Sequence, residues 1–204
     1  MAGIPLLVVL TGPSAAGKDS LLAHLKSLGR PLRQAQGRPY HFVETATTRQ
    51  RRGDERAGID YVFVSEEQFD AVLQAEELLE HAEVYGHRYG VPRQPVREAL
   101  ASGRDALMRT DVQGARYIKG KYPSAVTIFV APPSEEEMER RLRGRASDTA
   151  AQIELRLRKA KEEMAASGEF DYTVVNDDIA RCAGEIERIM ERERMRPGRA
   201  AVAV

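Results

Sequence analysis

Cysteine and net charge are the features that this sequence lacks most clearly. Cys182 is the only cysteine, so an internal disulfide is impossible and one thiol cannot by itself form a zinc site. The 31 basic residues equal the 31 acidic residues in number, which leaves no overall field to hold a nucleic acid polymer or an anionic membrane. We therefore expect small-molecule ligands, local charged patches, and neither a nucleic acid nor a membrane as partner.

Long apolar runs are also missing. No stretch approaches the roughly 20 residues that a membrane-spanning helix needs, and the first residues lack the pattern of a secretory signal. Together with the single thiol, these absences predict a protein of the reducing cytoplasm. Cys182 lies in a helical pattern and is interpreted as a small packing residue rather than a nucleophile. With 42% hydrophobic and 30% charged residues, the chain can form one globular domain with a substantial core.

A glycine-rich stretch follows the first apolar run. Residues 6–10 predict a central parallel strand, and GPSAAGKDS then leads into a helix predicted over residues 18–28. Glycines in such a turn let backbone N–H groups surround a polyphosphate at a helix N-terminus, and the lysine adds a positive charge. The predicted ATP ligands in this stretch are Gly12, Pro13, Ser14, Ala15, Ala16, Gly17, Lys18, Asp19 and Ser20. A glycine-rich turn without a nucleotide is the alternative interpretation.

The residue after Lys18 departs from the usual phosphate-loop pattern. That pattern has Ser or Thr at this position, and its hydroxyl ligates Mg²⁺. This chain has Asp19 there, and Ser20 comes one residue later. Carboxylates are suitable ligands for a hard cation, so Asp19, directly or through water, and Ser20 are the predicted Mg²⁺ ligands.

An arginine-rich segment occupies residues 41–64. Its sequence predicts a strand end at 45–48, a loop punctuated by glycine, and an alternating strand at 61–64. Arg49, Arg51 and Arg52 lie close together in this loop, and planar guanidinium groups suit the recognition of a phosphate. By composition alone, a charged hairpin turn is an equally good interpretation.

Periodicity and capping residues predict the remaining elements. The predicted helices span 66–73 with Ser65 as cap, 96–101, 112–121, 135–143 with Ser134 and Glu137 as a capping box, and 179–194. The predicted strands lie within 78–89 and at 105–110, 125–130 and 172–175. We interpret residues 29–39 as a loop and expect the tail 197–204 to be disordered.

Two separated stretches together resemble the guanylate kinase family. Residues 47–63, TTRQRRGDERAGIDYVF, match its pattern T-[ST]-R-x-x-[RK]-x-x-[DE]-x-x-G-x-x-Y-x-[FY] position for position, and GPSAAGK is similar to its phosphate loop. The stretches LLEHAEVYG, DVQGA, APPS, RLRGR and DYTVVND occur in the family's order. The resemblance covers about residues 6–192.

The resemblance implies a nucleoside-monophosphate kinase of the α/β class. Its P-loop parallel sheet, flanked by helices, would carry a smaller mixed α/β monophosphate-binding region and a short lid. The implied single domain has a core of residues 1–43, 96–142 and 153–196, a GMP-binding region at about 44–95, and a lid at about 143–152. The implied reaction is the phosphorylation of GMP, and of dGMP, by ATP with Mg²⁺ in purine nucleotide metabolism. We expect a monomer or a weak homodimer.

The family's acceptor-site residues carry over one at a time. Arg49, Arg52 and Tyr61 would hold the monophosphate, and Thr45 and Tyr89 match further contacts with the base and phosphate.

Glu80 matches the carboxylate that reads guanine. A carboxylate accepts hydrogen bonds from both N1–H and the 2-amino group of guanine, whereas adenine presents an acceptor at N1. The wrong base would leave a buried carboxylate unpaired, which is costly. Asp111, at the end of a predicted strand, is a candidate substrate or Mg²⁺-water ligand, and a helix cap is its alternative role.

The resemblance also assigns residues to the transferring group. Arg145 and Arg156 match the lid and post-lid arginines that reach it, with Arg141 as a third candidate, and Asn176 would lie near the donor adenine. The predicted catalytic residues are Lys18, Arg49, Arg145 and Arg156. By composition, many arginines of residues 138–164 instead belong to a solvated helix face.

Two departures from the family pattern bear on the acceptor. Val91 stands where the family usually has Ser or Thr to reach guanine O6, and Arg109 stands where an acidic residue is common. One alternative is a kinase for another phosphate acceptor such as ribose 1,5-bisphosphate, since GKDSLL resembles the loop of ribose bisphosphate phosphokinases. The other is a non-enzymatic guanylate-kinase-like binding module, although such modules usually have a degraded phosphate loop and this chain keeps Gly17 and Lys18.

Overall fold

The central sheet is parallel and has the phosphate loop at its middle strand. The computed structural model describes residues 4–27, 40–53, 55–144 and 149–204. Five strands pair in the order β2-β7-β1-β8-β9. Their bounds are β1 (Leu7–Thr11), β2 (His41–Phe42), β7 (Ala106–Arg109), β8 (Val126–Ala131) and β9 (Tyr172–Val175). Because each neighbouring pair is parallel, the carboxyl ends of all five strands meet at one edge, where open parallel sheets bind ligands.

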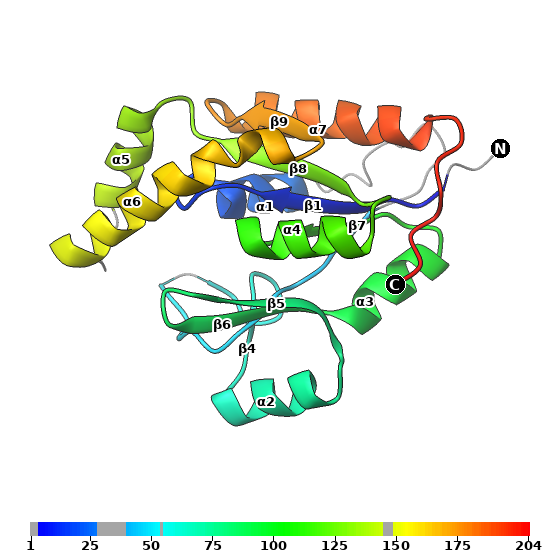
Figure 1. Ribbon diagram of the computed structural model, residues 1–204, viewed down its shortest axis with the longest axis horizontal. Coiled ribbons are helices and arrows are strands. Elements are labelled where there is room, and N and C mark those ends of the chain that lie inside the picture. Colours follow the sequence, from blue (N-terminus) through cyan, green and yellow to red (C-terminus); the bar gives the residue numbers. More distant parts are fainter. Residues whose placement is uncertain (1–3, 28–39, 54, 145–148) are drawn as a thin grey trace.

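Both faces of this sheet are covered, which explains why β1 reads as a continuous apolar run. Leu7 and Val9 belong to one hydrophobic cluster, whereas Leu6, Val8 and Leu10 belong to the cluster on the other face. Helices α1 (Lys18–Ser27) and α7 (Ile179–Arg194) cover one face, and α4 (Val112–Lys121) covers the other (Figure 1). The predicted buried parallel strand is confirmed.

A second, smaller sheet lies beyond α4. It has the order β4-β3-β6-β5, with β3 parallel to β4 and antiparallel to β6. Its bounds are β3 (Ala46–Thr47), β4 (Val62–Phe63), β5 (Leu78–Val84) and β6 (His87–Pro92), with α2 (Glu66–Gln74) beneath it and α3 (Arg93–Ala101) returning to the core. Ser65 and Gln68 form a capping box at the start of α2. Helix α4 lies between the two sheets, in contact with β5 on one side and with β1 and β8 on the other (Figure 1).

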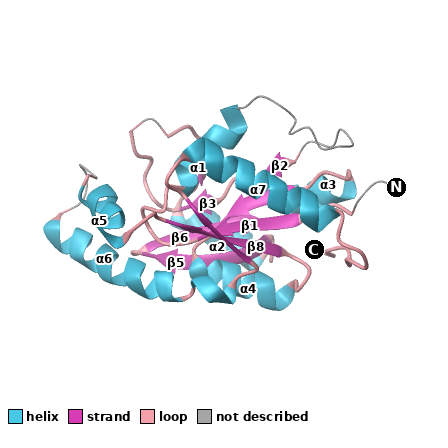
Figure 2. Cartoon of the chain, turned by 90° about the horizontal axis from the view of Figure 1, so that it is seen from above, coloured by secondary structure: helices cyan, strands magenta, loops and turns pink. Residues whose placement is uncertain are grey.

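Two helices at one end of the molecule flank the segment predicted to be the lid. Figures 1 and 2 both place α5 (Glu135–Arg143) and α6 (Ala150–Ala165) at the end opposite the two termini. A short 3-10 turn, η1 (Ser167–Glu169), follows α6. The predicted capping box at α5 is only half present: Ser134 accepts from the N–H of Glu137, but the Glu137 carboxylate binds Arg140 and Arg141. Residues 145–148 of the predicted lid, and the predicted loop 29–39, lie outside the described residues.

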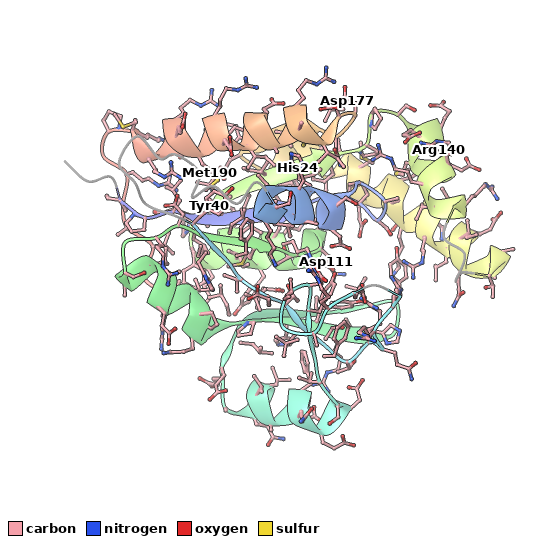
Figure 3. All side chains as sticks on the ribbon, turned by 180° about the vertical axis from the view of Figure 1, so that it is seen from behind. His24, Tyr40, Asp111, Arg140, Asp177 and Met190 are labelled. Atoms are coloured by element: carbon pink, nitrogen blue, oxygen red, sulfur yellow. The ribbon has the colours of Figure 1, made fainter. Side chains whose placement is uncertain are left out.

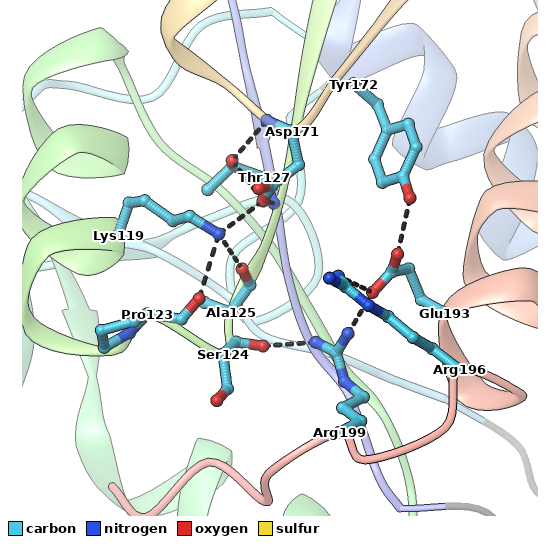
Figure 4. A network of polar contacts seen from close by, with 10 residues as sticks. All are labelled: Lys119, Pro123, Ser124, Ala125, Thr127, Asp171, Tyr172, Glu193, Arg196 and Arg199. Atoms are coloured by element: carbon cyan, nitrogen blue, oxygen red, sulfur yellow. Dashed lines mark hydrogen bonds and ion pairs between the residues drawn. The ribbon is translucent and has the colours of Figure 1, made fainter.

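The tail 197–204, for which the sequence analysis expects disorder, makes contacts with the core. Glu193 of α7 is buried, with 5% of its surface exposed, and its carboxylate contacts the Arg199 guanidinium and accepts from the Tyr172 hydroxyl (Figure 4). Arg199 also donates to the carbonyl of Ser124. A buried carboxylate requires a cation, and the tail supplies it. Val202 and Val204 then pack against the core.

The burial of Cys182 agrees with the sequence analysis. Cys182 is fully buried in α7, and burial raises the pKa of its thiol to about 11, which confirms the packing role. Within the described ranges, no helix combines the length and the apolar composition that crossing a bilayer requires.

Candidate active site

One pocket joins most of the predicted site residues. It has a volume of about 400 Å³ and lies at the carboxyl edge of the central sheet, facing the smaller sheet. The predicted residues that line it are Gly12, Pro13, Ser14, Ala15, Gly17, Lys18, Asp19, Ser20, Thr45, Arg49, Arg52, Tyr61, Glu80, Tyr89, Asp111 and Arg156. Ala16 and Asn176 are buried behind the loop, and Arg145 lies outside the described residues.

The phosphate loop is shaped by its glycines and by contacts from behind. Gly12 and Gly17 have φ of 133° and 85°, and a Cβ on Gly12 would overlap the backbone carbonyl of Val130. The Asn176 side chain donates to the carbonyl of Ala16 at 2.8 Å. Asn176 therefore supports the loop from the turn after β9, although sequence reasoning placed it near the donor base.

Lys18 is turned back onto its own loop. Its ammonium donates to the carbonyls of Gly12 at 2.5 Å and Pro13 at 3.0 Å. Burial lowers the pKa of Lys18, and the nearby carboxylates of Glu163, Asp19 and Asp111 act in the opposite direction. A half-buried ammonium whose hydrogen bonds go to two loop carbonyls is suited to an incoming anion.

Helices α5 and α6 contribute side chains that sequence reasoning missed or ranked low. The Glu163 carboxylate accepts from the N–H of Ser14 at 3.3 Å, and burial raises its pKa. Arg141 donates to the carbonyls of Ala15 at 3.4 Å and Asn176 at 3.0 Å. Glu163 follows Arg156 by seven positions on α6, two helical turns and hence the same face, which is the sequence signal that could have found it.

The acceptor side contains an arginine held ready by a carboxylate. Arg49 is 5% exposed, and its two terminal nitrogens donate to the Glu55 carboxylate at 3.1 and 2.8 Å. Its guanidinium lies 5.3 Å from the centre of the Tyr61 ring, and Tyr61 in turn meets Tyr89 edge to face. The Arg52 backbone N–H also donates to Glu55. Glu55 thus holds the guanidinium of Arg49 and the backbone of Arg52.

Glu80 is the most unusual group in the pocket. It is 4% exposed, and one carboxyl oxygen, Oε2, has no hydrogen-bond partner. Burial, reinforced by Asp111, raises the pKa of Glu80 to about 8. Gly114 of α4 lies so close that a Cβ there would be 2.5 Å from this oxygen. A buried carboxyl group that lines a pocket and has one oxygen without a hydrogen-bond partner is suited to a ligand that donates hydrogen bonds.

Asp111 and Val91 surround this carboxylate. Asp111 caps α4 by accepting from the N–H of Gly114 at 2.8 Å and also lines the pocket, so the capping role is confirmed and a ligand role remains a proposal. Figure 3 shows Asp111 between the central and the smaller sheet. Val91 pairs with Glu80 across β5 and β6 but is fully buried in the core and does not line the pocket.

The donor set around the phosphate loop fits Mg²⁺. Asp19 is exposed over 65% of its side chain and Ser20 lines the pocket beside it. Magnesium is usually held by one or two carboxylates, with substrate phosphates and water completing its octahedral shell. Asp19 fits that type of site, although its Oδ1 already lies 3.0 Å from the Nε of Arg109.

Comparison with known proteins decides the family. The family model described as guanylate kinase matches residues 5–193. The chain belongs to the guanylate kinase family. A guanylate kinase from Synechocystis sp. is 43% identical over 92% of this chain and 94% of its own length. One from Parasynechococcus marenigrum is 45% identical over 90% of this chain and 97% of its own length. The crystal structure of guanylate kinase from Anaplasma phagocytophilum covers 97% of this chain and 90% of its own, with 31% identity and a TM-score of 0.76.

Membership of the guanylate kinase family confirms three predictions from the sequence. These are the family itself, the α/β class with a parallel sheet flanked by helices, and the assignment as a nucleotide-binding P-loop kinase. The pocket brings residues of the acceptor motif and of the phosphate loop together, as a transfer between two phosphates requires.

Proposed function

We propose that this protein transfers the γ-phosphoryl group of ATP to GMP, and to dGMP, in cytoplasmic purine nucleotide metabolism. The single observation that carries the choice of acceptor is Glu80, a buried residue that lines the same pocket as the phosphate loop and has one carboxyl oxygen without a hydrogen-bond partner. Family membership supports the general reaction. The acceptor details and the residue roles are our inference.

On the donor side, the phosphate loop binds the polyphosphate of ATP. The phosphate loop and the first residues of α1 line the pocket, and Lys18 would move its charge from the loop carbonyls to the phosphates. Mg²⁺, bound through Asp19 and Ser20, would neutralise charge on the β and γ phosphates.

On the acceptor side, the arginines of the motif hold the GMP phosphate. Arg49, Arg52 and Tyr61 line one wall, and the planar fork of Arg49 is already aligned by Glu55 before any ligand arrives. Thr45 and Tyr89 line the same wall and contribute further polar contacts. Preorganised donors lose little conformational entropy when the phosphate binds, so less of the interaction free energy is offset and the binding is tighter.

Glu80 selects the base. In its ionised form, the carboxylate accepts from N1–H and from the 2-amino group of guanine, and Asp111 lies next to it in the pocket. Adenine would place an acceptor against this group and leave a buried charge unpaired. Val91 does not reach the pocket, so guanine O6 takes no donor from that residue.

The transfer is an in-line displacement without a covalent enzyme intermediate. A GMP phosphate oxygen forms a bond to the γ-phosphorus while the bond to the β–γ bridging oxygen breaks, and ADP leaves. Arg156 and Arg141 line the pocket and neutralise the equatorial oxygens, with Arg145 as a third such cation. Closure of the lid region excludes water, which prevents hydrolysis of ATP.

A coupled assay of ADP release tests the function. GMP, dGMP, AMP, UMP and ribose 1,5-bisphosphate are offered in turn with ATP and Mg²⁺. We expect turnover with GMP and dGMP and at least ~100-fold lower kcat/KM with AMP. A higher kcat/KM with ribose 1,5-bisphosphate than with GMP would mean that ribose 1,5-bisphosphate, and not GMP, is the acceptor. ADP release with none of the five would favour the binding-module alternative.

A further inference from the structure

The two residues that depart most from the family pattern touch each other. Asp19 replaces the usual hydroxyl after the loop lysine, and Arg109 replaces the acid common at the end of β7. Their side chains form an ion pair, with the Nε of Arg109 3.0 Å from Oδ1 of Asp19. Together the pair carries no net charge, whereas a hydroxyl and an acid would carry one negative charge. The two replacements together therefore remove one negative charge from the site, and the two new charges pair with each other.

Arg109 also reaches the acceptor loop. Its Nη2 donates to the carbonyl of Asp60 at 2.5 Å, and its guanidinium lies 4.1 Å from the centre of the Tyr61 ring. The side chain is 10% exposed and lines the pocket between these two groups. One guanidinium thus contacts the start of α1 on the donor side and residues 60–61 on the acceptor side.

Moving the Arg109 guanidinium out of this position would cost free energy, because it is a buried charge paired with Asp19. Burial alone would lower the pKa of Arg109, but Asp19 first and Tyr61 after it outweigh burial, so the pKa is raised and the group stays charged. Its Nε has no aligned hydrogen-bond acceptor, so the contact with Asp19 is mainly an ion pair. Without Asp19 the arginine would be a buried charge without its counter-ion, and without Arg109 a bare carboxylate would face the phosphates.

We propose that Arg109 is a positioning residue that clamps the loop carrying Tyr61 to the start of α1 through Asp19, and so fixes the separation between the acceptor phosphate and the donor phosphates. This inference rests on the proposed function, because it takes Tyr61 as a ligand of the acceptor phosphate. Arg109 acts through Asp19 and Tyr61, whose positions it sets. The fork of an arginine is required, since a lysine ammonium cannot reach all three partners in one plane.

A double-mutant cycle on GMP binding tests the clamp. The GMP dissociation constant is measured by calorimetry without ATP or Mg²⁺ for wild type, Asp19→Ser, Arg109→Asp and the double variant. In Arg109→Asp, two carboxylates face each other, and we expect on the order of 100-fold weaker GMP binding. The double variant restores the residue types of the usual pattern and should bind within ~10-fold of wild type. Steady-state kinetics should show the loss mainly in KM for GMP.

Two further variants keep the test decisive if Arg109→Asp does not fold. Arg109→Lys retains the charge, and we expect it to keep the melting temperature while binding GMP ~10-fold more weakly, because the contact with Asp60 is lost. The matched control is Arg116→Gln, which removes an exposed arginine paired with Glu169 outside the pocket and should leave GMP binding unchanged.

Additive effects in the cycle, or wild-type GMP affinity in Arg109→Lys, would overturn the clamp. Failure of the proposed function looks different. If the wild-type protein does not phosphorylate GMP, the acceptor is wrong whatever the cycle gives. If the wild type phosphorylates GMP and the cycle is additive, only the role of Arg109 is wrong.

Discussion

The protonation of Glu80 makes GMP binding depend on pH in a calculable way. The carboxyl group has a pKa of about 8 in the unliganded protein because it is buried. Only the ionised form can accept from both guanine donors. At pH 7 roughly one tenth of the protein carries the ionised form, so the apparent GMP affinity there is about tenfold, or ~1.4 kcal/mol, below its limit at high pH. Binding at pH 7 should release nearly one proton.

Glu80→Gln removes this dependence together with the affinity. The amide oxygen can accept one guanine donor, but its NH₂ group then faces the other, so we expect ~100-fold weaker GMP binding, in line with the loss of a charge-assisted hydrogen bond. Calorimetry at pH 7 in two buffers of different ionisation heat measures the protons released. The count should fall close to zero in Glu80→Gln.

The matched control for this experiment lies on the same strand. Glu83 is exposed in β5, and it does not line the pocket. Glu83→Gln should keep wild-type GMP affinity and proton release. If wild type releases no proton between pH 7 and 8, or if Glu80→Gln retains the full pH dependence, Glu80 does not read guanine as an ionised carboxylate.

Four further outcomes follow from the described contacts. Lys18→Ala should lower kcat by at least ~100-fold with little change in GMP binding, because the loss falls on the transferring group; wild-type turnover would refute the mechanism. Gly114→Ala should weaken GMP binding about tenfold or more, because its Cβ would displace Glu80. The control is Gly120→Ala in the same helix, which has open space at its Cβ and should raise the free energy of unfolding by ~0.5–1 kcal/mol. Arg199→Ala leaves Glu193 without this partner and should lower the free energy of unfolding by about 3 kcal/mol, which corresponds to a melting temperature several degrees lower. An unchanged melting temperature would mean that Arg199 does not hold Glu193. The pKa of Glu80 is raised from 4.5 to about 8 in the unliganded protein. The stabilisation that this shift contributes is therefore full below pH 4.5 and is lost as pH rises through 8. Glu80→Gln should consequently have a higher melting temperature than wild type at pH 8, but not below pH 4.5.

The central sheet could be predicted because its signals are local. The apolar run before the phosphate loop gave β1, and the predicted strand 172–175 and helix 179–194 coincide with β9 and α7. Caps and apolar periodicity act within a few residues, so one sequence is enough to read them. The acceptor arginines and Glu80 were found by resemblance to a long motif, and the structure gathers them in one pocket.

Contacts between distant segments could not be predicted. Nothing near Asp19 or Arg109 in the sequence indicates that they pair, because the contact arises only when β7 lies beside β1. Disorder was expected for residues 197–204 because they lie at the end of the chain, whereas Arg199 in this tail contacts a buried carboxylate on α7. Such pairings are decided by tertiary packing, for which a single sequence carries no periodic signal.

The strand order also has a consequence for how the protein is made. β1 is the middle strand of the central sheet, yet both of its neighbours, β7 and β8, come later in the chain. A ribosome therefore releases the phosphate loop long before the backbone of Val130, against which Gly12 packs, exists. Until β8 has emerged, β1 is an apolar strand with an unpaired edge, a state prone to aggregation. The first strand of the growing chain therefore lacks both of its sheet neighbours for much of the synthesis.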